Sequence, residues 1–192
     1  LYVAQEGGLL VVDSVNLGLK NTIPIAKVID DLVVSPDGEN IYVLAGDRLF
    51  IVKVSNWQVR SIPINGGDPG YGCISLSVDG RRAYIVGNYQ GGTLHVLDID
   101  EEVVSASINV GMGGGRDCKL HPSGRYFYYL SEYEAKVCVV DVLNAPVMIR
   151  SVSVGGNPVG LDITPNGARV YVCIGFFISV LAIVDGVPVS VA

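Results

Sequence analysis

One turn motif recurs along the chain at a nearly constant spacing. Its copies are SPDG at 35–38, SVDG at 77–80, HPSG at 121–124 and TPNG at 164–167, with glycines 42, 44 and 43 residues apart. Proline presets φ, the Asp, Ser or Asn can bond its own backbone, and glycine takes a positive φ, so each copy should join two antiparallel strands. A fixed period of this size indicates a repeat fold.

Runs that favour β-structure follow each turn. A tyrosine lies four residues after each turn glycine, within a β-favouring run, and we expect it to pack in the gap between neighbouring sheets; these are Tyr42, Tyr84, Tyr128 and Tyr171. A third strand ends in a Val-Val-Asp-like form in most units, and a fourth strand precedes a glycine-rich link. Four strands in each unit of about 43 residues predict the blade of a β-propeller, and helical or leucine-rich periodicity is absent.

The strand order divides the chain into about 4.75 blades of four antiparallel strands, an all-β fold. The expected blades cover residues 1–30, without their first strand, then 31–69, 70–113, 114–156 and 157–192. A propeller closes its ring so that no edge strand stays unpaired. We therefore expect either a segment of a longer propeller or a five-bladed ring lacking one inner strand. Closing the longer ring requires further blades or another chain.

The order of apolar strand, Ser-Pro-Asp-Gly turn, Tyr-Val strand and Val-Val-Asp strand resembles the YVTN-type β-propellers over essentially the whole chain. The resemblance implies that the chain is part of a seven-bladed ring. Relatives by this resemblance include archaeal and bacterial cell-surface proteins, lactonase-like enzymes and propeller subunits of quinone-dependent amine dehydrogenases. The motif therefore indicates a fold and leaves the activity open.

Composition narrows the classes of function. Hydrophobic residues make up 49% of the chain and charged residues 17%, so most strands should be buried on both faces, as in stacked sheets. The formal net charge is −6 and no run of Lys or Arg occurs, so nucleic acid is not an expected partner. The most apolar stretch, 170–184, is shorter than a helical membrane span of about 17–25 residues, and we interpret it as two strands.

A ligand site is expected around the mouth of the central channel. In a propeller, the links between blades and the loops between second and third strands share this face. The candidate ligand-binding residues are Asp68, Tyr71, Arg116, Asp117, Tyr133 and Asn157. The glycine run before Arg116 has the composition of an anion nest, but it enters a strand and not a helix, which favours a plain link between blades.

The sequence offers no clear catalytic or metal-binding arrangement. Asp117, His121 and Ser123 have the residue types of a hydrolytic triad, but triad members normally converge from distant segments. With two histidines, no clustered carboxylates and no C-x-x-C pair, we expect neither a metal nor a cofactor, although a calcium site built from scattered Asp residues of several blades stays open. The cysteines are interpreted as apolar fillers of strands: Cys73, Cys118, Cys138 and Cys173.

These features favour a non-catalytic propeller scaffold or binding module that contacts a protein or a cell-envelope component. The alternative is an enzyme, either a lactonase-like hydrolase or a propeller subunit of a quinone-dependent dehydrogenase. Convergent carboxylates, His or Arg with shifted pKa values around a concave pocket would favour the enzyme. Low charge, a pI of about 4.8 and the resemblance to surface proteins suggest the cell surface, the extracellular space or the periplasm.

Overall fold

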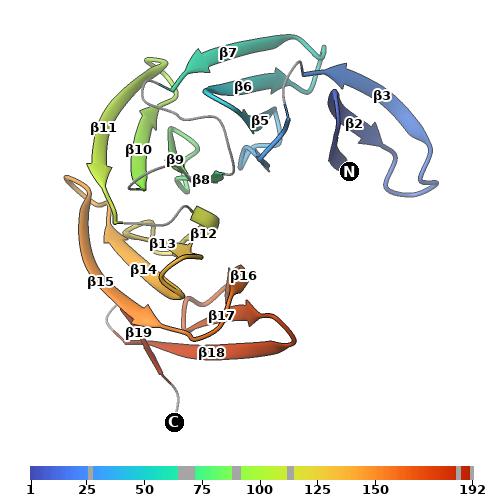
Figure 1. The fold of residues 1–192 in the computed structure, drawn as a ribbon. Coiled ribbons are helices and arrows are strands. Elements are labelled where there is room, and N and C mark those ends of the chain that lie inside the picture. The colour runs from blue at the N-terminus through green and yellow to red at the C-terminus, as the bar shows by residue number, and fades with distance from the viewer. Residues whose placement is uncertain (26–27, 65–71, 88–91, 112–114, 185–186, 191–192) are drawn as a thin grey trace.

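The computed structural model describes residues 1–25, 28–64, 72–87, 92–111, 115–184 and 187–190. These residues form nineteen strands in five antiparallel sheets, in each of which the strands follow one another in sequence order. The sheets succeed one another around an open arc whose two ends are the first and the last sheet (Figure 1). The all-β propeller fold is thus confirmed. The described segments contain no helix with the length and apolarity of a bilayer span.

Each sheet runs from an inner strand near the axis of the arc to an outer strand. The first sheet comprises β1 (Tyr2–Gln5), β2 (Gly8–Val12) and β3 (Leu19–Pro24). The second comprises β4 (Asp31–Val34), β5 (Asn40–Ala45), β6 (Arg48–Lys53) and β7 (Val59–Pro63). The third comprises β8 (Cys73–Leu76), β9 (Arg82–Val86), β10 (Thr93–Asp98) and β11 (Val103–Asn109). The fourth comprises β12 (Gly115–Leu120), β13 (Tyr126–Ser131), β14 (Lys136–Asp141) and β15 (Val147–Ser153). The fifth comprises β16 (Pro158–Ile163), β17 (Arg169–Ile174), β18 (Phe177–Val184) and β19 (Val187–Ser190).

The recurring turn forms as its chemistry predicts. In the second sheet, the Ser35 hydroxyl donates to Asp37 Oδ1 at 2.5 Å and accepts from the backbone N–H of Asn40 at 2.9 Å. Gly38 has a φ of +74°, and its N–H donates to the Ser35 carbonyl at 2.9 Å. The side chain of the first turn residue therefore closes the hairpin from inside, and glycine supplies the left-handed conformation that reverses the chain.

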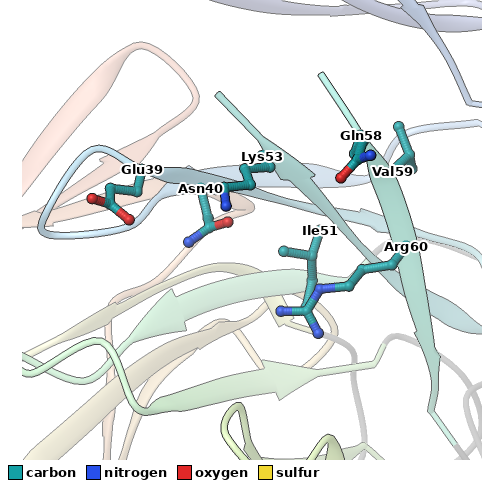
Figure 2. A pocket seen from close by; sticks show the side chains of 7 residues that line it. All are labelled: Glu39, Asn40, Ile51, Lys53, Gln58, Val59 and Arg60. Atoms are coloured by element: carbon teal, nitrogen blue, oxygen red, sulfur yellow. The ribbon is translucent and has the colours of Figure 1, made fainter. Parts of the chain in front are cut away.

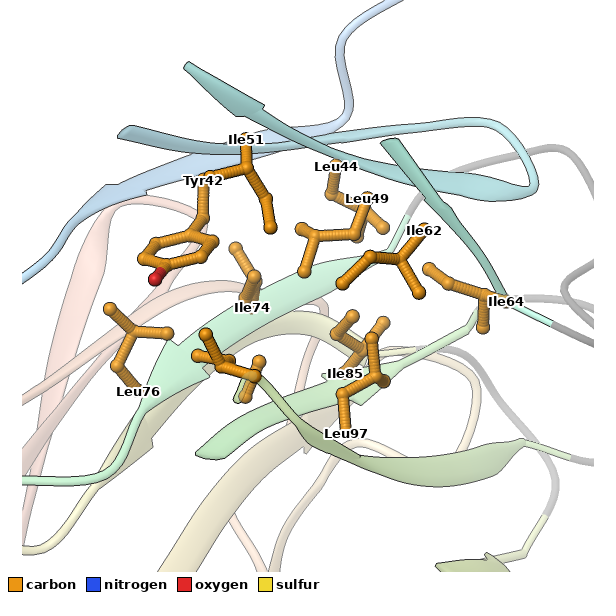
Figure 3. Packing of buried hydrophobic residues seen from close by; sticks show 12 residues of the cluster. Tyr42, Leu44, Leu49, Ile51, Ile62, Ile64, Ile74, Leu76, Ile85 and Leu97 are labelled. Carbon is orange, nitrogen blue, oxygen red and sulfur yellow. The ribbon is translucent and has the colours of Figure 1, made fainter. Parts of the chain in front are cut away.

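The apolar core lies between neighbouring sheets. Figure 3 shows the interface of the second and third sheets, where Tyr42, Leu49 and Ile51 pack against Ile74 and Ile85. The equivalent tyrosines of the third and fourth sheets are buried in the next two interfaces in the same way. The packing role expected for the tyrosines is confirmed at these three positions, because the same gap between sheets recurs once per blade.

Side chains satisfy the free edges of the inner strands. Oδ2 of Asp31 accepts a hydrogen bond from the N–H of Ile74 in the next sheet at 3.0 Å, and Oδ2 of Asp117 accepts one from Leu161 at 2.8 Å. Ser75 Oγ likewise accepts a hydrogen bond from the N–H of Leu120 in the inner strand of the fourth sheet. A buried backbone N–H without a partner is costly, so these bonds hold successive sheets together around the axis.

The outward faces of the two end sheets are exposed. Tyr42 and Leu49 of the second sheet are 3% and 0% exposed under the third sheet, whereas the equivalent Tyr171 and Ile178 of the fifth sheet are 36% and 65% exposed. Cys173 lies on the same face and is also exposed. The expectation that every strand tyrosine and cysteine is buried is therefore wrong for Tyr171 and Cys173, since no sheet in the described chain covers this face.

Candidate functional site

The antiparallel strand order sorts the connections onto two faces. The turns between first and second strands and between third and fourth strands lie on one face, which we call the turn face. The loops between second and third strands and the links between sheets lie on the other, which we call the mouth face. The sequence predicted the ligand site on the mouth face.

The mouth-face candidates are not brought together into one described site. Asp68 and Tyr71 lie outside the described residues. Arg116 is an exposed residue of β12, and Tyr133, 79% exposed, lies in the turn between β13 and β14. Within the described ranges, no hydrogen bond or ion pair joins Arg116, Tyr133 and the exposed Asn157 to one another. Since residues 112–114 also lie outside the described residues, the plain link predicted before Arg116, in preference to an anion nest, stays a prediction.

Asp117 has a structural role. Its Oδ1 accepts from the N–H of Cys118 at 2.8 Å, and its Oδ2 accepts from the N–H of Leu161 at 2.8 Å, which joins the fourth sheet to the fifth. Asp31 holds the equivalent position in the second sheet. Both residues lie four positions before the first residue of a turn motif, Ser35 or His121, and this fixed offset is the signal by which the sequence could have revealed them.

His121 and Ser123 belong to a turn and not to a triad. The Nδ1 atom of His121 lies 2.7 Å from Ser123 Oγ, and its Nε2 lies 3.0 Å from the carbonyl oxygen of Gly167. Because that carbonyl can only accept, Nε2 carries the proton and Nδ1 accepts from the serine hydroxyl. The imidazole thus links two successive turns, while Asp117 is bonded elsewhere. This geometry assembles no acid–base–nucleophile relay.

A small polar cluster lies on the inner strands near the axis. Burial raises the pKa of Asp31, and the negative charge of Asp117 raises it further, whereas backbone N–H groups and Lys119 oppose the rise. Burial also raises the pKa of the thiols of Cys73 and Cys118. In the described part of the chain, no three His, Cys, Asp or Glu side chains are grouped so that they could hold a metal ion.

The turn face carries three adjoining concave regions, with volumes of about 560, 490 and 560 Å³. The first lies over β5 to β7, as Figure 2 shows. Asn40 and Arg60 line both the first region and the middle one. Asp79, Arg81 and Asp100 line both the middle region and the third. The regions therefore form one groove, the turn-face groove, which extends from the second sheet to the fourth.

The middle region of the groove has an excess of negative charge. Its ionisable side chains other than tyrosine are four carboxylates and two guanidinium groups, from Asp37, Asp79, Asp100, Glu102, Arg60 and Arg81. Arg60 forms an ion pair with Glu102 across the interface of the second and third sheets, and Arg81 Nε lies 3.6 Å from Asp100 Oδ2. These pairs are on the rim and screened by solvent, so they order the groove more than they stabilise the fold.

Asp37 and Asp79, the two carboxylates of this region that form neither of these ion pairs, stay ionised. The Ser35 hydroxyl lowers the pKa of Asp37, helped by the backbone N–H of Glu39. The Ser77 hydroxyl lowers the pKa of Asp79 in the same way, helped by a backbone N–H and by the charge of Arg81. No salt bridge of the described residues involves Asp37 or Asp79. The sequence showed these residues only as turn formers, and their convergence in one groove is a tertiary result.

Comparison with known proteins supports the fold. No protein-family model matches the chain, and no curated protein matches its sequence. Among solved structures, hydrazine synthase of Kuenenia stuttgartiensis is similar, with a TM-score of 0.72 and 18% sequence identity over 84% of this chain and 48% of that one. The chain thus spans about half the length of that structure. At this identity the likeness concerns the propeller-like fold alone and carries no activity over.

Proposed function

We propose that this chain is a non-catalytic module of a YVTN-type β-propeller that binds its partner through the turn-face groove. The observation that carries the proposal is the groove itself, which is continuous, charged and lined by residues of three sheets. A ligand lying along it would contact side chains that the repeat supplies at equivalent positions of successive blades.

The titratable groups favour binding over catalysis. Asp117 is committed to backbone N–H groups of two sheets, and both ring nitrogens of His121 are engaged, one by Ser123 and one by a carbonyl. A hydrolase requires a nucleophile and a base that are free to exchange a proton at an open site. Carboxylates and guanidinium groups on rigid turns suit recognition of a charged ligand.

The turns that wall the groove pack against one another. Successive turns lie against one another: Pro36 Cδ is 3.1 Å from the position that a Cβ on Gly80 would occupy, and Val78 Cγ2 is 3.7 Å from that of Gly124. Each turn is also closed by the hydrogen bonds of its own serine or histidine. Binding to a preformed surface of this kind does not carry the entropy cost of ordering its loops.

We also propose that further blades, of the same or another chain, cover the two exposed end faces in the functional molecule. Tyr171 and Ile178 at one end, and Leu1, Val3 and Leu19 at the other, are exposed large apolar side chains on those faces. In the interior interfaces the positions equivalent to Tyr171 and Ile178 are buried. This supports a larger propeller. The small share of charged residues and the resemblance to surface proteins support a surface-exposed or secreted propeller that contacts a protein or cell-envelope component.

Peptide selection tests the groove against the mouth face. Heptapeptides that bind the protein are first selected from a random display library. They are then titrated against three proteins: the unchanged chain, the variant Lys53→Glu in the groove and the variant Arg116→Glu on the mouth face. We expect Lys53→Glu to change the affinity about fivefold and Arg116→Glu to leave it unchanged, since an exposed charge pair contributes up to about 1 kcal/mol. The reverse pattern would move binding to the mouth face. Turnover of a lactone panel, without peptide binding, would support the hydrolase instead.

A further inference from the structure

Tyr42 places a buried hydroxyl group on the turn-face groove. Tyr42 as a whole is 3% exposed, and its ring packs among the aliphatic residues between the second and third sheets, with the hydroxyl at the margin of that cluster (Figure 3). Tyr42 lines the middle region of the groove. No described residue forms a hydrogen bond with its hydroxyl. A buried hydroxyl without a partner costs stability, so its partner is to be sought in the groove.

The equivalent tyrosines of the next two sheets are satisfied within the chain. Burial raises the pKa of the Tyr84 hydroxyl, and a side-chain hydrogen bond with Arg82 opposes that rise. In the fourth sheet, the ring of His121 packs edge-on against Tyr128, with centroids 6.0 Å apart. Tyr128 also has a partner of its own. The open hydroxyl is therefore particular to Tyr42 and not a property of the repeat.

The surroundings of this hydroxyl select a cation that carries hydrogen-bond donors. Burial raises the pKa of Tyr42, although the charge of Arg60 opposes that rise. The group is neutral at physiological pH and offers an acceptor oxygen. Asp37 and Asp79 line the same region as ionised carboxylates without salt bridges to described residues, and the region as a whole has two more carboxylates than guanidinium groups. An ammonium or guanidinium group supplies both the charge and the donors that these oxygens need.

The shape of the groove favours a side chain on an extended backbone over a free amine. Regions of about 560 Å³ continue from the middle region on both sides. The first region has the opposite charge balance, because Lys53 and Arg60 outnumber Glu39 there. We infer that the middle region binds a lysine or arginine side chain of an extended segment of a protein partner, with an acidic residue of that segment in the first region. This inference rests on the proposed binding function of the groove.

Matched peptides and matched tyrosine variants test the inference. The probes are acetylated, amidated Gly-Glu-Gly-Lys-Gly and its arginine and norleucine analogues, titrated into ¹⁵N-labelled protein. The expected readout is a shift of the Gly38 and Gly80 amide resonances. We expect the lysine and arginine peptides to bind at least about tenfold more tightly than the norleucine peptide, because only they supply the cation. Tyr42→Phe should weaken them about fivefold and Tyr84→Phe should not.

The outcomes separate this inference from the proposed function. Tyr42→Phe should unfold at the same urea concentration as the unchanged chain or a higher one, since it removes an unpaired hydroxyl, so a loss of binding cannot be ascribed to misfolding. If the norleucine peptide binds as tightly as the lysine peptide and both shift the groove amides, the inference is overturned and the binding function stands. If no probe shifts those amides while selected heptapeptides depend on Arg116, both are overturned.

Discussion

The contribution of side-chain bonds between sheets can be measured at Asp117. The variant Asp117→Ala removes a carboxylate that accepts from Leu161 of the fifth sheet and from Cys118 of its own strand, both at 2.8 Å. Asp162→Ala is the matched control, because among the described residues the Asp162 carboxylate accepts only from Ile163 of its own strand, at 3.0 Å. The difference between the two alanine variants isolates the bond that joins the sheets.

The expected difference in the free energy of unfolding is about 2 kcal/mol. A hydrogen bond to a charged group contributes about 1.5–3 kcal/mol net. Asp117 is half-buried, so solvent screening places its bond toward the lower end of that range. For a chain of this size, about 1 kcal/mol corresponds to about 2–4 °C in the unfolding midpoint. Asp117→Ala should therefore unfold about 4–8 °C below Asp162→Ala.

Urea unfolding followed by far-ultraviolet circular dichroism supplies the free energies, provided that the slope of the transition is the same in both variants. Amide hydrogen exchange adds a local measurement, since the Leu161 N–H should exchange faster in Asp117→Ala and not in Asp162→Ala. Equal losses of stability in the two variants, with unchanged exchange at Leu161, would refute the idea that this carboxylate holds the sheets together.

Three further results are expected. At pH 8 an aromatic disulfide reagent should modify only Cys173 in the native chain and all four thiols in urea, since burial shields the others and raises their pKa values: Cys73, Cys118 and Cys138. Gly167→Ala should cost about 1 kcal/mol more than Gly38→Ala, although both glycines have positive φ, because a Cβ on Gly167 would lie 2.3 Å from His121 Nε2. A second substitution, His121→Ala, should abolish that difference. Stability should fall as the pH drops below about 4, because side-chain and backbone hydrogen bonds lower the pKa values of several carboxylates, so the unfolded chain binds more protons there. These carboxylates are Asp13, Asp37, Asp79 and Asp141.

Each of these results has a contradicting outcome. Rapid modification of a second thiol in the native chain would show that the interfaces open readily. Equal costs of the two glycine substitutions would show that the imidazole moves aside freely. A urea midpoint that stays constant between pH 5 and pH 2 would mean that the turn carboxylates gain nothing from their partners in the folded state.

Much of the fold was predictable because its signals are local. The turn chemistry at 35–38 and its three repeats marks where each hairpin reverses, and alternating β-favouring runs mark the strands around it. β11, Val103–Asn109, for example, is the fourth strand that the repeat predicts after the Val-Leu-Asp end of β10. The exact strand ends are less predictable, since Arg48 at the start of β6 is held by its Nε, which donates to Ser61 Oγ at 2.9 Å. Strand ends depend on such cross-strand bonds, which the sequence does not display.

The candidate site was less predictable. The mouth face was chosen because propellers usually bind ligands there, and two of its candidates, Asp68 and Tyr71, lie outside the described residues. The turn-face groove is assembled from residues such as Asn40 and Arg60 of the second sheet and Asp100 of the third, which share no motif. Their convergence depends on how the sheets stack, and no pattern within one blade encodes it.

Turn chemistry and β-propensity act over a few neighbouring residues, so the repeat, its hairpins and the residue at each repeated position can be recognised without a structure. The role of each such residue depends on how the sheets pack. Tyr42, Tyr84 and Tyr171 occupy the same place in the motif, yet one presents an unpaired hydroxyl to a groove, one bonds to an arginine and one is exposed. Their surroundings come from a neighbouring blade or from its absence, and burial and hydrogen bonding depend on that contact and not on the local sequence.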